Sequence, residues 1–154
     1  MRLNSIRVIL TLVAIAIACG QPEFAVAQKG SAANELAGTS WKLVKLQGGD
    51  EMTSVPDDGS KYTVTFETNG RVTSKVDCNR GSSSWKAVGG NKLQFGSWSM
   101  TRAKCGPGSL HDRIVTEGVA VSSYSIKNGH LFLSGMAAGG YYELEPLTTP
   151  RRRP

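Results

Sequence analysis

Few side chains in this sequence combine the residue types and the spacing that catalysis needs. The only histidines are His111 and His130, and neither is accompanied by the G-x-S-x-G turn that presents a catalytic serine. These histidines could bind zinc together with Cys78 and Cys105, but the cysteines are far apart in sequence and no C-x-x-C pair is present. We therefore expect no catalytic residue, no metal and no cofactor, and a protein that is not an enzyme.

The acidic residues give no better candidate for catalysis. A hydrolase that uses two carboxyl groups needs both of them to face its substrate. Glu143 and Glu145 alternate along one face of an edge-like strand, and Asp57 and Asp58 lie in a loop with glycine and proline. We expect all four carboxylates to be solvated. The glycine pairs of the sequence also lack the Lys-Ser/Thr and the helix that follow a phosphate-binding loop.

The first 27 residues have the three-part pattern of a secretory signal peptide. A basic start precedes an uncharged apolar run over residues 8–19, and Ala25-Val26-Ala27 forms an A-x-A cleavage site before Gln28. As a helix the apolar run would span roughly 18 Å, which is too short for the ~30 Å core of a bilayer. We expect cleavage between Ala27 and Gln28, and release into the periplasm or the extracellular space.

The three cysteines fit export by either of two routes. In the alternative route, residues 16–19 act as a lipobox, Cys19 carries the lipid and the protein is a membrane-anchored lipoprotein. Both routes leave Cys78 and Cys105 as an even pair in an oxidising compartment. We therefore predict a Cys78–Cys105 disulfide, and contact with a membrane only if Cys19 is lipidated.

The charge of the chain does not favour nucleic-acid binding. The formal net charge is +6, but three of the cations are Arg151, Arg152 and Arg153, and no stripe of basic residues alternates with aromatic residues. Residues 147–154 are expected to be a disordered basic tail, and residues 28–35 a linker. We expect a monomer that does not bind nucleic acid.

Residues 36–146 are predicted to form one β-rich domain. Alternating apolar and polar residues on both sides of Asn69-Gly70 predict a hairpin over residues 61–77. Similar patterns predict strands around the turns at 89–91 and 128–129, a first strand over residues 40–46 and a last strand around residues 142–144. A single short helix is expected from Ser109 to about Val119. About seven or eight strands and one helix indicate a small antiparallel β-barrel, because closure hides the edges of the sheet.

The interior of such a barrel is expected to be filled by side chains. About eight strands enclose little more than their own inward-facing residues. Trp41, Trp85 and Trp98 are large enough to plug this space. The alternative is that these tryptophans line a ligand cavity.

Three motifs of the domain together resemble the META domain family, which includes the heat-inducible HslJ protein. They are Leu36-Ala37-Gly38-Thr39-Ser40-Trp41-Lys42-Leu43, Cys78-Asn79-Arg80 and Met100-Thr101-Arg102-Ala103-Lys104-Cys105, in this order. The resemblance covers about residues 36–146. It implies a lipocalin-like β-barrel in a bacterial envelope protein, with a link to stress or antibiotic tolerance and without an established reaction.

The motif residues beside the predicted disulfide form a candidate site for a partner or an anion. The bridge would place Asn79 and Arg80 close to Lys104, with Thr101 and Arg102 one step further along the chain. In a structural interpretation, Asn79 holds a turn and the guanidinium groups satisfy loop carbonyls or nearby acids. In a functional interpretation, the paired arginines bind a carboxylate or a phosphate.

These observations favour a non-catalytic exported module that binds an unidentified envelope protein or a cell-wall component. Two alternatives remain open from the sequence. The protein could carry a small molecule in the interior of the barrel, or it could inhibit a secreted hydrolase.

Overall fold

The computed structural model describes residues 35–49, 51–118, 121–135 and 139–147 of the chain. The predicted signal peptide, with Cys19, Ala27 and Gln28, lies outside these residues, as do most of the predicted linker and the tail from residue 148. Within the described residues, no helix is both long enough and apolar enough to cross a membrane.

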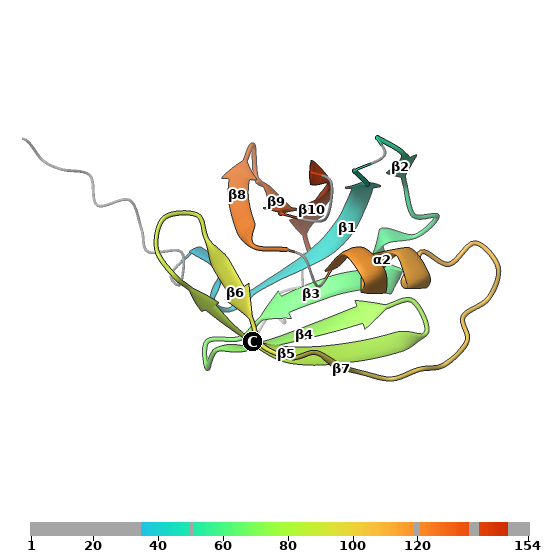
Figure 1. Cartoon of the computed structure of the whole chain (residues 1–154), viewed down its shortest axis with the longest axis horizontal. Coiled ribbons are helices and arrows are strands. Elements are labelled where there is room, and N and C mark those ends of the chain that lie inside the picture. The colour runs from blue at the N-terminus through green and yellow to red at the C-terminus, as the bar shows by residue number, and fades with distance from the viewer. Residues whose placement is uncertain (1–34, 50, 119–120, 136–138, 148–154) are drawn as a thin grey trace, which may run out of the picture.

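The protein is mainly β, and its strands belong to one antiparallel sheet that is nearly closed into a barrel of eight strands (Figure 1). The order in the barrel is β6-β5-β4-β3-β1-β10-β9-β8, and two short strands, β2 and β7, pair with β1 and β5. The strands are β1 (Thr39–Gln47), β2 (Thr53–Ser54), β3 (Tyr62–Phe66), β4 (Arg71–Val76), β5 (Asn79–Ala87), β6 (Leu93–Phe95), β7 (Ser99–Met100), β8 (Ser123–Lys127), β9 (His130–Ser134) and β10 (Tyr141–Pro146). A 3-10 turn, η1 (Gly59–Lys61), precedes β3, and the helix α2 (His111–Gly118) lies between β7 and β8.

The predicted hairpins are present, and their turns have the expected residues. At the β8–β9 turn, Asn128 and Gly129 both have positive φ angles, 52° and 80°. Such angles belong to the type I′ turn, which suits an Asn-Gly pair. At the β3–β4 turn only Gly70 has a positive φ, and the Asn69 side chain accepts a hydrogen bond from the Arg71 amide.

The barrel closes where β6 meets the start of β8. Lys92 pairs with Ser123 in an isolated bridge. The amide of Leu93 donates to the carbonyl of Ser122 at 2.9 Å, and the amide of Tyr124 donates to the carbonyl of Asn91 at 2.9 Å. These few bonds satisfy backbone groups that would otherwise remain on two open sheet edges.

The expectation that the last strand lies at an edge is wrong. β10 lies between β1 and β9. The side chain of Glu145 is paired with Lys42, and that of Glu143 contacts Lys45 and His130. These carboxylates are on the outer surface, as expected, but each is held by a cross-strand ion pair because its strand has neighbours on both sides.

Aromatic side chains fill one half of the barrel interior. Phe66 is fully buried and meets the ring of Trp85 edge-on, with 5.1 Å between ring centroids. Phe95 is the cross-strand partner of Trp85, and its ring centroid lies 6.4 Å from that of Phe66. Trp41 is also buried, and its indole nitrogen donates to Thr39. In this half the prediction that tryptophans plug the barrel is confirmed for Trp41 and Trp85.

Candidate functional site

The other half of the barrel is hollow. It contains a partly open cavity of about 340 Å³, a volume at the lower end of typical small-ligand sites. The expectation that side chains fill the whole interior is therefore wrong. The reason is that Trp41 and Trp85 are packed in the filled half, and Trp98 is the one tryptophan that lines the cavity.

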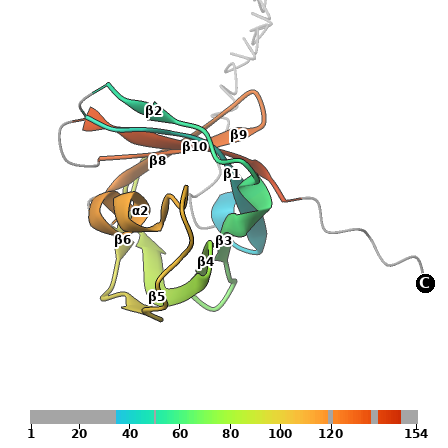
Figure 2. The same ribbon diagram turned by 90° about the vertical axis from the view of Figure 1, so that its right-hand side faces the viewer.

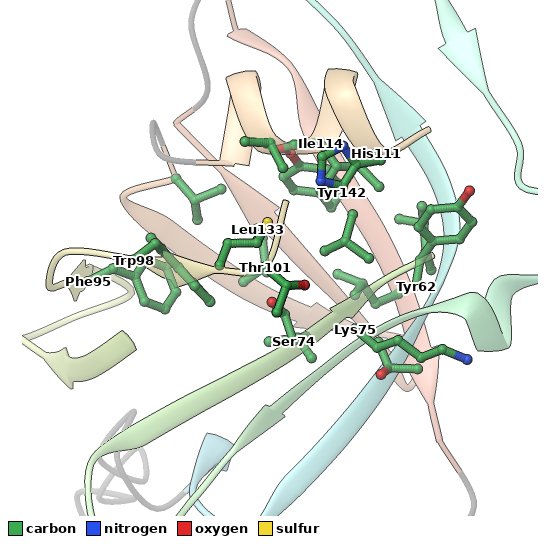
Figure 3. A pocket seen from close by; sticks show the side chains of 18 of the residues that line it. Tyr62, Ser74, Lys75, Phe95, Trp98, Thr101, His111, Ile114, Leu133 and Tyr142 are labelled. Atoms are coloured by element: carbon green, nitrogen blue, oxygen red, sulfur yellow. Dashed lines mark hydrogen bonds between the residues drawn. The ribbon is translucent and has the colours of Figure 1, made fainter. Parts of the chain in front are cut away.

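The lining of the cavity is mostly apolar and comes from strands on both sides of the barrel. The alternation of β3 and β4 brings Tyr62, Val64 and Val76 into the lining. β9 and β10 contribute Leu133 and Tyr142, which lie across the cavity from Ser74 in Figure 3. The remaining apolar residues of the lining are Leu43, Phe95, Trp98, Met100, Ile114, Val115, Val121 and Leu144. The polar residues of the lining are Thr63, Ser74, Lys75, Thr101, Arg102 and His111.

Helix α2 lies across the open end of the barrel. Figure 2 shows it between strands β8–β10 and strands β3–β6. The amide of Leu110 donates to the hydroxyl of Tyr62 at 3.0 Å, and the hydroxyl of Tyr142 donates to the carbonyl of Ile114 at 3.1 Å. Two inward-facing tyrosines from opposite walls thus hold the helix in place.

The start of the helix agrees with the sequence, within one or two residues. The hydroxyl of Ser109 accepts a hydrogen bond from the amide of His111, as expected of a residue that caps a helix. On the outer side, Arg113 donates to Ser54 at 2.6 Å and to the carbonyl of Met52 at 2.8 Å, so the helix is also tied to β2.

Two polar atoms in the lining are buried and have no hydrogen-bond partner in the structure. They are Nε2 of His111 and Oγ of Ser74. Figure 3 shows His111 on the side of the helix, with Ile114 and Tyr142, and Ser74 on the side of the strands, with Thr101. The other ring nitrogen of His111, Nδ1, lies 2.9 Å from a carboxylate oxygen of Asp112.

This arrangement does not form a catalytic triad. A triad needs a hydrogen bond between the nucleophile and the histidine that activates it. Because neither Ser74 Oγ nor His111 Nε2 has a partner, the two atoms are not bonded to each other. Among the described residues, no group of three or more His, Cys, Asp or Glu side chains could hold a metal ion.

The predicted disulfide is present beside the cavity. Cys78 and Cys105 are bonded, with 5.6 Å between their Cα atoms. The bridge joins the start of β5 to the segment that leads into α2. We call the bridge, together with Asn79, Thr101 and Ala103, the Cys78–Cys105 anchor.

Asn79 is the central polar residue of the anchor. Its side chain is fully buried. Its amide nitrogen donates to the carbonyl of Ala103 at 2.8 Å, and its amide oxygen accepts from the Ala103 amide at 2.7 Å and from the Thr101 hydroxyl at 2.9 Å. The structural interpretation expected Asn79 to hold a turn through its side chain; the side chain instead binds a segment more than twenty residues away.

The backbone segments that carry the basic motif residues lie next to each other, but the side chains of these residues lie in different places. The amide of Thr101 donates to the carbonyl of Arg80, so the two segments are adjacent. Arg102 lines the cavity, whereas Arg80 lines an adjoining outer groove along β4 and β5. The groove also contains Arg71, and it shares Ser74 and Lys75 with the cavity. Arg80, Arg102 and Lys104 are exposed, and within the described part of the chain their side chains form no hydrogen bond or ion pair. Their role as a partner or anion site stays a prediction.

The sequence contained signals for the positions of Ser74 and His111 in the cavity, which were not predicted. Ser74 takes an inward position between Val72 and Val76 in the alternating pattern of β4. His111 lies three residues, about one helical turn, before Ile114, and therefore on the same face of the helix, which meets the barrel. A serine and a histidine at positions where the periodicity predicts inward-facing apolar residues therefore indicate a candidate binding site.

The comparisons with known proteins agree with the fold. The family model for the META domain matches residues 34–145. An NMR structure of a protein from Burkholderia xenovorans is similar, with a TM-score of 0.64 and 21% identity over 77% of this chain and 88% of that chain. A crystal structure of a DUF4847 family protein from Bacteroides vulgatus has a TM-score of 0.52 and 14% identity over 73% of this chain and 94% of that chain. No curated protein sequence matches the chain.

Proposed function

Since the chain belongs to the META domain family, we propose that it is a non-catalytic, exported binding module of the bacterial envelope whose ligand is a small, largely apolar molecule held in the barrel. The observation that carries this proposal is the cavity of about 340 Å³ with its apolar and aromatic lining. Binding sites for small molecules are typically concave, mostly apolar and marked by a few polar groups. The cavity has all three properties.

The rigidity of the surrounding structure supports the same function. The disulfide, the Asn79 hydrogen bonds and the two tyrosine contacts fix the segments that border the opening. A preformed cavity loses less conformational entropy on binding than one that must be assembled around the ligand. The protein is therefore suited to hold a ligand without a catalytic step.

Ligand binding can be tested with the fluorescent apolar probe N-phenyl-1-naphthylamine. We expect the mature protein to bind one probe molecule, with a rise in probe fluorescence. In Val64→Phe, an added ring enters the cavity and should weaken binding at least tenfold. Thr65→Phe is the matched control, because the neighbouring position on β3 faces outward.

Native mass spectrometry of gently purified protein gives an independent test. A bound small molecule should appear as a discrete mass increment in wild-type protein and be lost in Val64→Phe. Equal probe binding by wild-type protein and Val64→Phe, or no binding by either, would contradict a carrier function for the barrel interior.

Export is tested separately by the intact mass of the protein from its native host. The proposal expects a chain that starts at Gln28, or at a lipidated Cys19. A mature protein that retains residues 1–18 would rule out export by this signal.

A second candidate function is recognition of an anionic envelope component through Arg80, Arg102 and Lys104. The observation that favours it is that these exposed cations have no side-chain partner in the described part of the chain. Crosslinking in envelope extracts, with and without replacement of Arg80, would identify what such a surface captures.

A further inference from the structure

The polar atoms of the cavity restrict the chemistry of its ligand. A buried donor or acceptor without a partner costs about 1–3 kcal/mol, and native structures contain few such atoms. The cavity contains two of them, His111 Nε2 and Ser74 Oγ. A ligand that carries oxygen atoms can give such an atom a hydrogen-bond partner, whereas a pure hydrocarbon would leave both unsatisfied.

The state of His111 narrows the choice of oxygen group. A carboxylate only accepts hydrogen bonds, so the Asp112 carboxylate 2.9 Å from Nδ1 places a proton on that nitrogen. Nε2 then presents a lone pair when the ring is neutral, or an N–H when it is charged. An ionised carboxylate only accepts, so it can take a hydrogen bond from the Nε2 N–H of the charged ring.

The charges around the cavity favour an anion over a cation. Arg102 lines the cavity, Lys75 lies between the cavity and the outer groove, and none of the described lining residues is acidic, although the Asp112 carboxylate contacts His111 from outside the lining. Arg102 is exposed, and in the described part of the chain its side chain has no partner. A guanidinium group in this position suits a carboxylate, and a cationic amphiphile would meet like charges.

The volume of the cavity limits the size of the apolar part. At about 30 Å³ for each water-sized atom of a liquid, a cavity of about 340 Å³ holds on the order of 11 non-hydrogen atoms. A straight chain of about ten carbon atoms has this size. A full phospholipid with two long chains is much larger.

We propose that the ligand is a monocarboxylic acid with an apolar body of about ten carbon atoms, whose body fills the cavity and whose carboxyl group lies near Arg102 and His111. This inference rests on the proposed function, since it assumes that the cavity binds a small molecule. It adds the chemical class of that molecule and the residues that select it.

The test compares ligands that share one apolar chain and differ only in the head group. Decanoate, methyl decanoate and decyltrimethylammonium are titrated into the mature protein, and displacement of N-phenyl-1-naphthylamine is measured. We expect decanoate to bind at least tenfold more tightly than methyl decanoate, and decyltrimethylammonium to bind most weakly. Arg102→Gln should remove most of the preference for decanoate over the ester. Arg80→Gln is the matched control, because Arg80 is near in the fold but lines the outer groove.

The outcomes separate this inference from the function on which it rests. If neither the probe nor any decyl compound binds, the proposed function fails and the inference fails with it. If the probe binds but the ester competes as well as the acid, the cavity binds ligands and the inferred acid class is wrong. If the acid is preferred but Arg102→Gln and Arg80→Gln behave alike, the assignment of the carboxyl group to Arg102 is overturned.

Discussion

The Cys78–Cys105 anchor and the cavity beside it differ in whether their buried polar groups have hydrogen-bond partners. In the anchor, the fully buried amide of Asn79 makes three side-chain hydrogen bonds to Thr101 and Ala103. In the cavity, His111 Nε2 and Ser74 Oγ have none. Satisfied buried polar groups rigidify a structure, whereas unsatisfied ones cost stability. We infer that the anchor stabilises the fold and that the cavity binds a ligand, and this contrast can be tested residue by residue.

The largest effect is expected on removal of the disulfide. The bridge closes a loop with a sequence separation of 27, which corresponds to about 3.5 kcal/mol in the chain-entropy model. The Cys78→Ala, Cys105→Ala double variant should therefore melt about 10–15 °C below wild type. Calorimetry of the variant and of reduced wild-type protein should give the same shift, and a fall of less than 3 °C would mean that the bridge does not stabilise the anchor.

The next largest effect is expected at Asn79. In Asn79→Ala, the amide and carbonyl of Ala103 lose their partner, the fully buried side-chain amide of Asn79, and we expect a loss of about 2 kcal/mol. Urea unfolding measures this loss. Asn91→Ala is the control, because Asn91 is exposed and its replacement should change the free energy of unfolding by less than about 0.5 kcal/mol. Equal effects of the two substitutions would mean that the hydrogen bonds of Asn79 do not stabilise the anchor.

The sequence predicted the barrel and the anchor better than it predicted the cavity. Period-two patterns and Asn-Gly turns are local signals, so the hairpins of β3–β4 and β8–β9 could be predicted from a few residues each. The even pair of cysteines predicted the bridge. The partners of Asn79 could not be predicted, because they depend on how the segment before α2 folds back onto β5.

The cavity depends on a property that no local pattern contains. Whether a barrel is filled or hollow follows from the summed volumes of all its inward side chains and from where they lie along the axis. Phe66 and Trp85 fill one half, whereas the wall of the other half includes the small side chain of Ser74, and a cavity remains there. The number of tryptophans predicts a filled barrel interior, but it does not show that two of the three lie outside the lining of the cavity.

A smaller effect, of opposite sign to that at Asn79, is expected at Ser74. Without a ligand, Ser74→Ala removes a buried hydroxyl that has no partner, so the variant should be as stable as wild type or more stable by up to about 1 kcal/mol. Ser83→Ala is the matched control on β5, because the Ser83 hydroxyl is buried and donates to the carbonyl of Ser84. The control should lose about 1 kcal/mol in urea unfolding. A clear loss in both variants would show that Ser74 is satisfied in solution, and the contrast between anchor and cavity would weaken.

The smallest effect on stability is expected at the two arginines that lie next to the anchor. Both are exposed, and in the described part of the chain neither side chain forms a hydrogen bond or an ion pair. The Arg80→Ala, Arg102→Ala double variant should therefore unfold within about 0.5 kcal/mol of wild type, which is a shift of no more than about 2–4 °C. Calorimetry of this variant and of Asn79→Ala compares the change in melting temperature caused by loss of the two arginines with the change caused by loss of the buried amide. A fall of the melting temperature by many degrees would mean that the guanidinium groups support the anchor, and their assignment to ligand or partner recognition would then be wrong. If the variant is as stable as wild type but no longer binds decanoate, the arginines bind the ligand and do not stabilise the fold. The residues that stabilise this end of the barrel would then differ from those that bind the ligand, and the anchor would serve to hold Arg102 at the cavity.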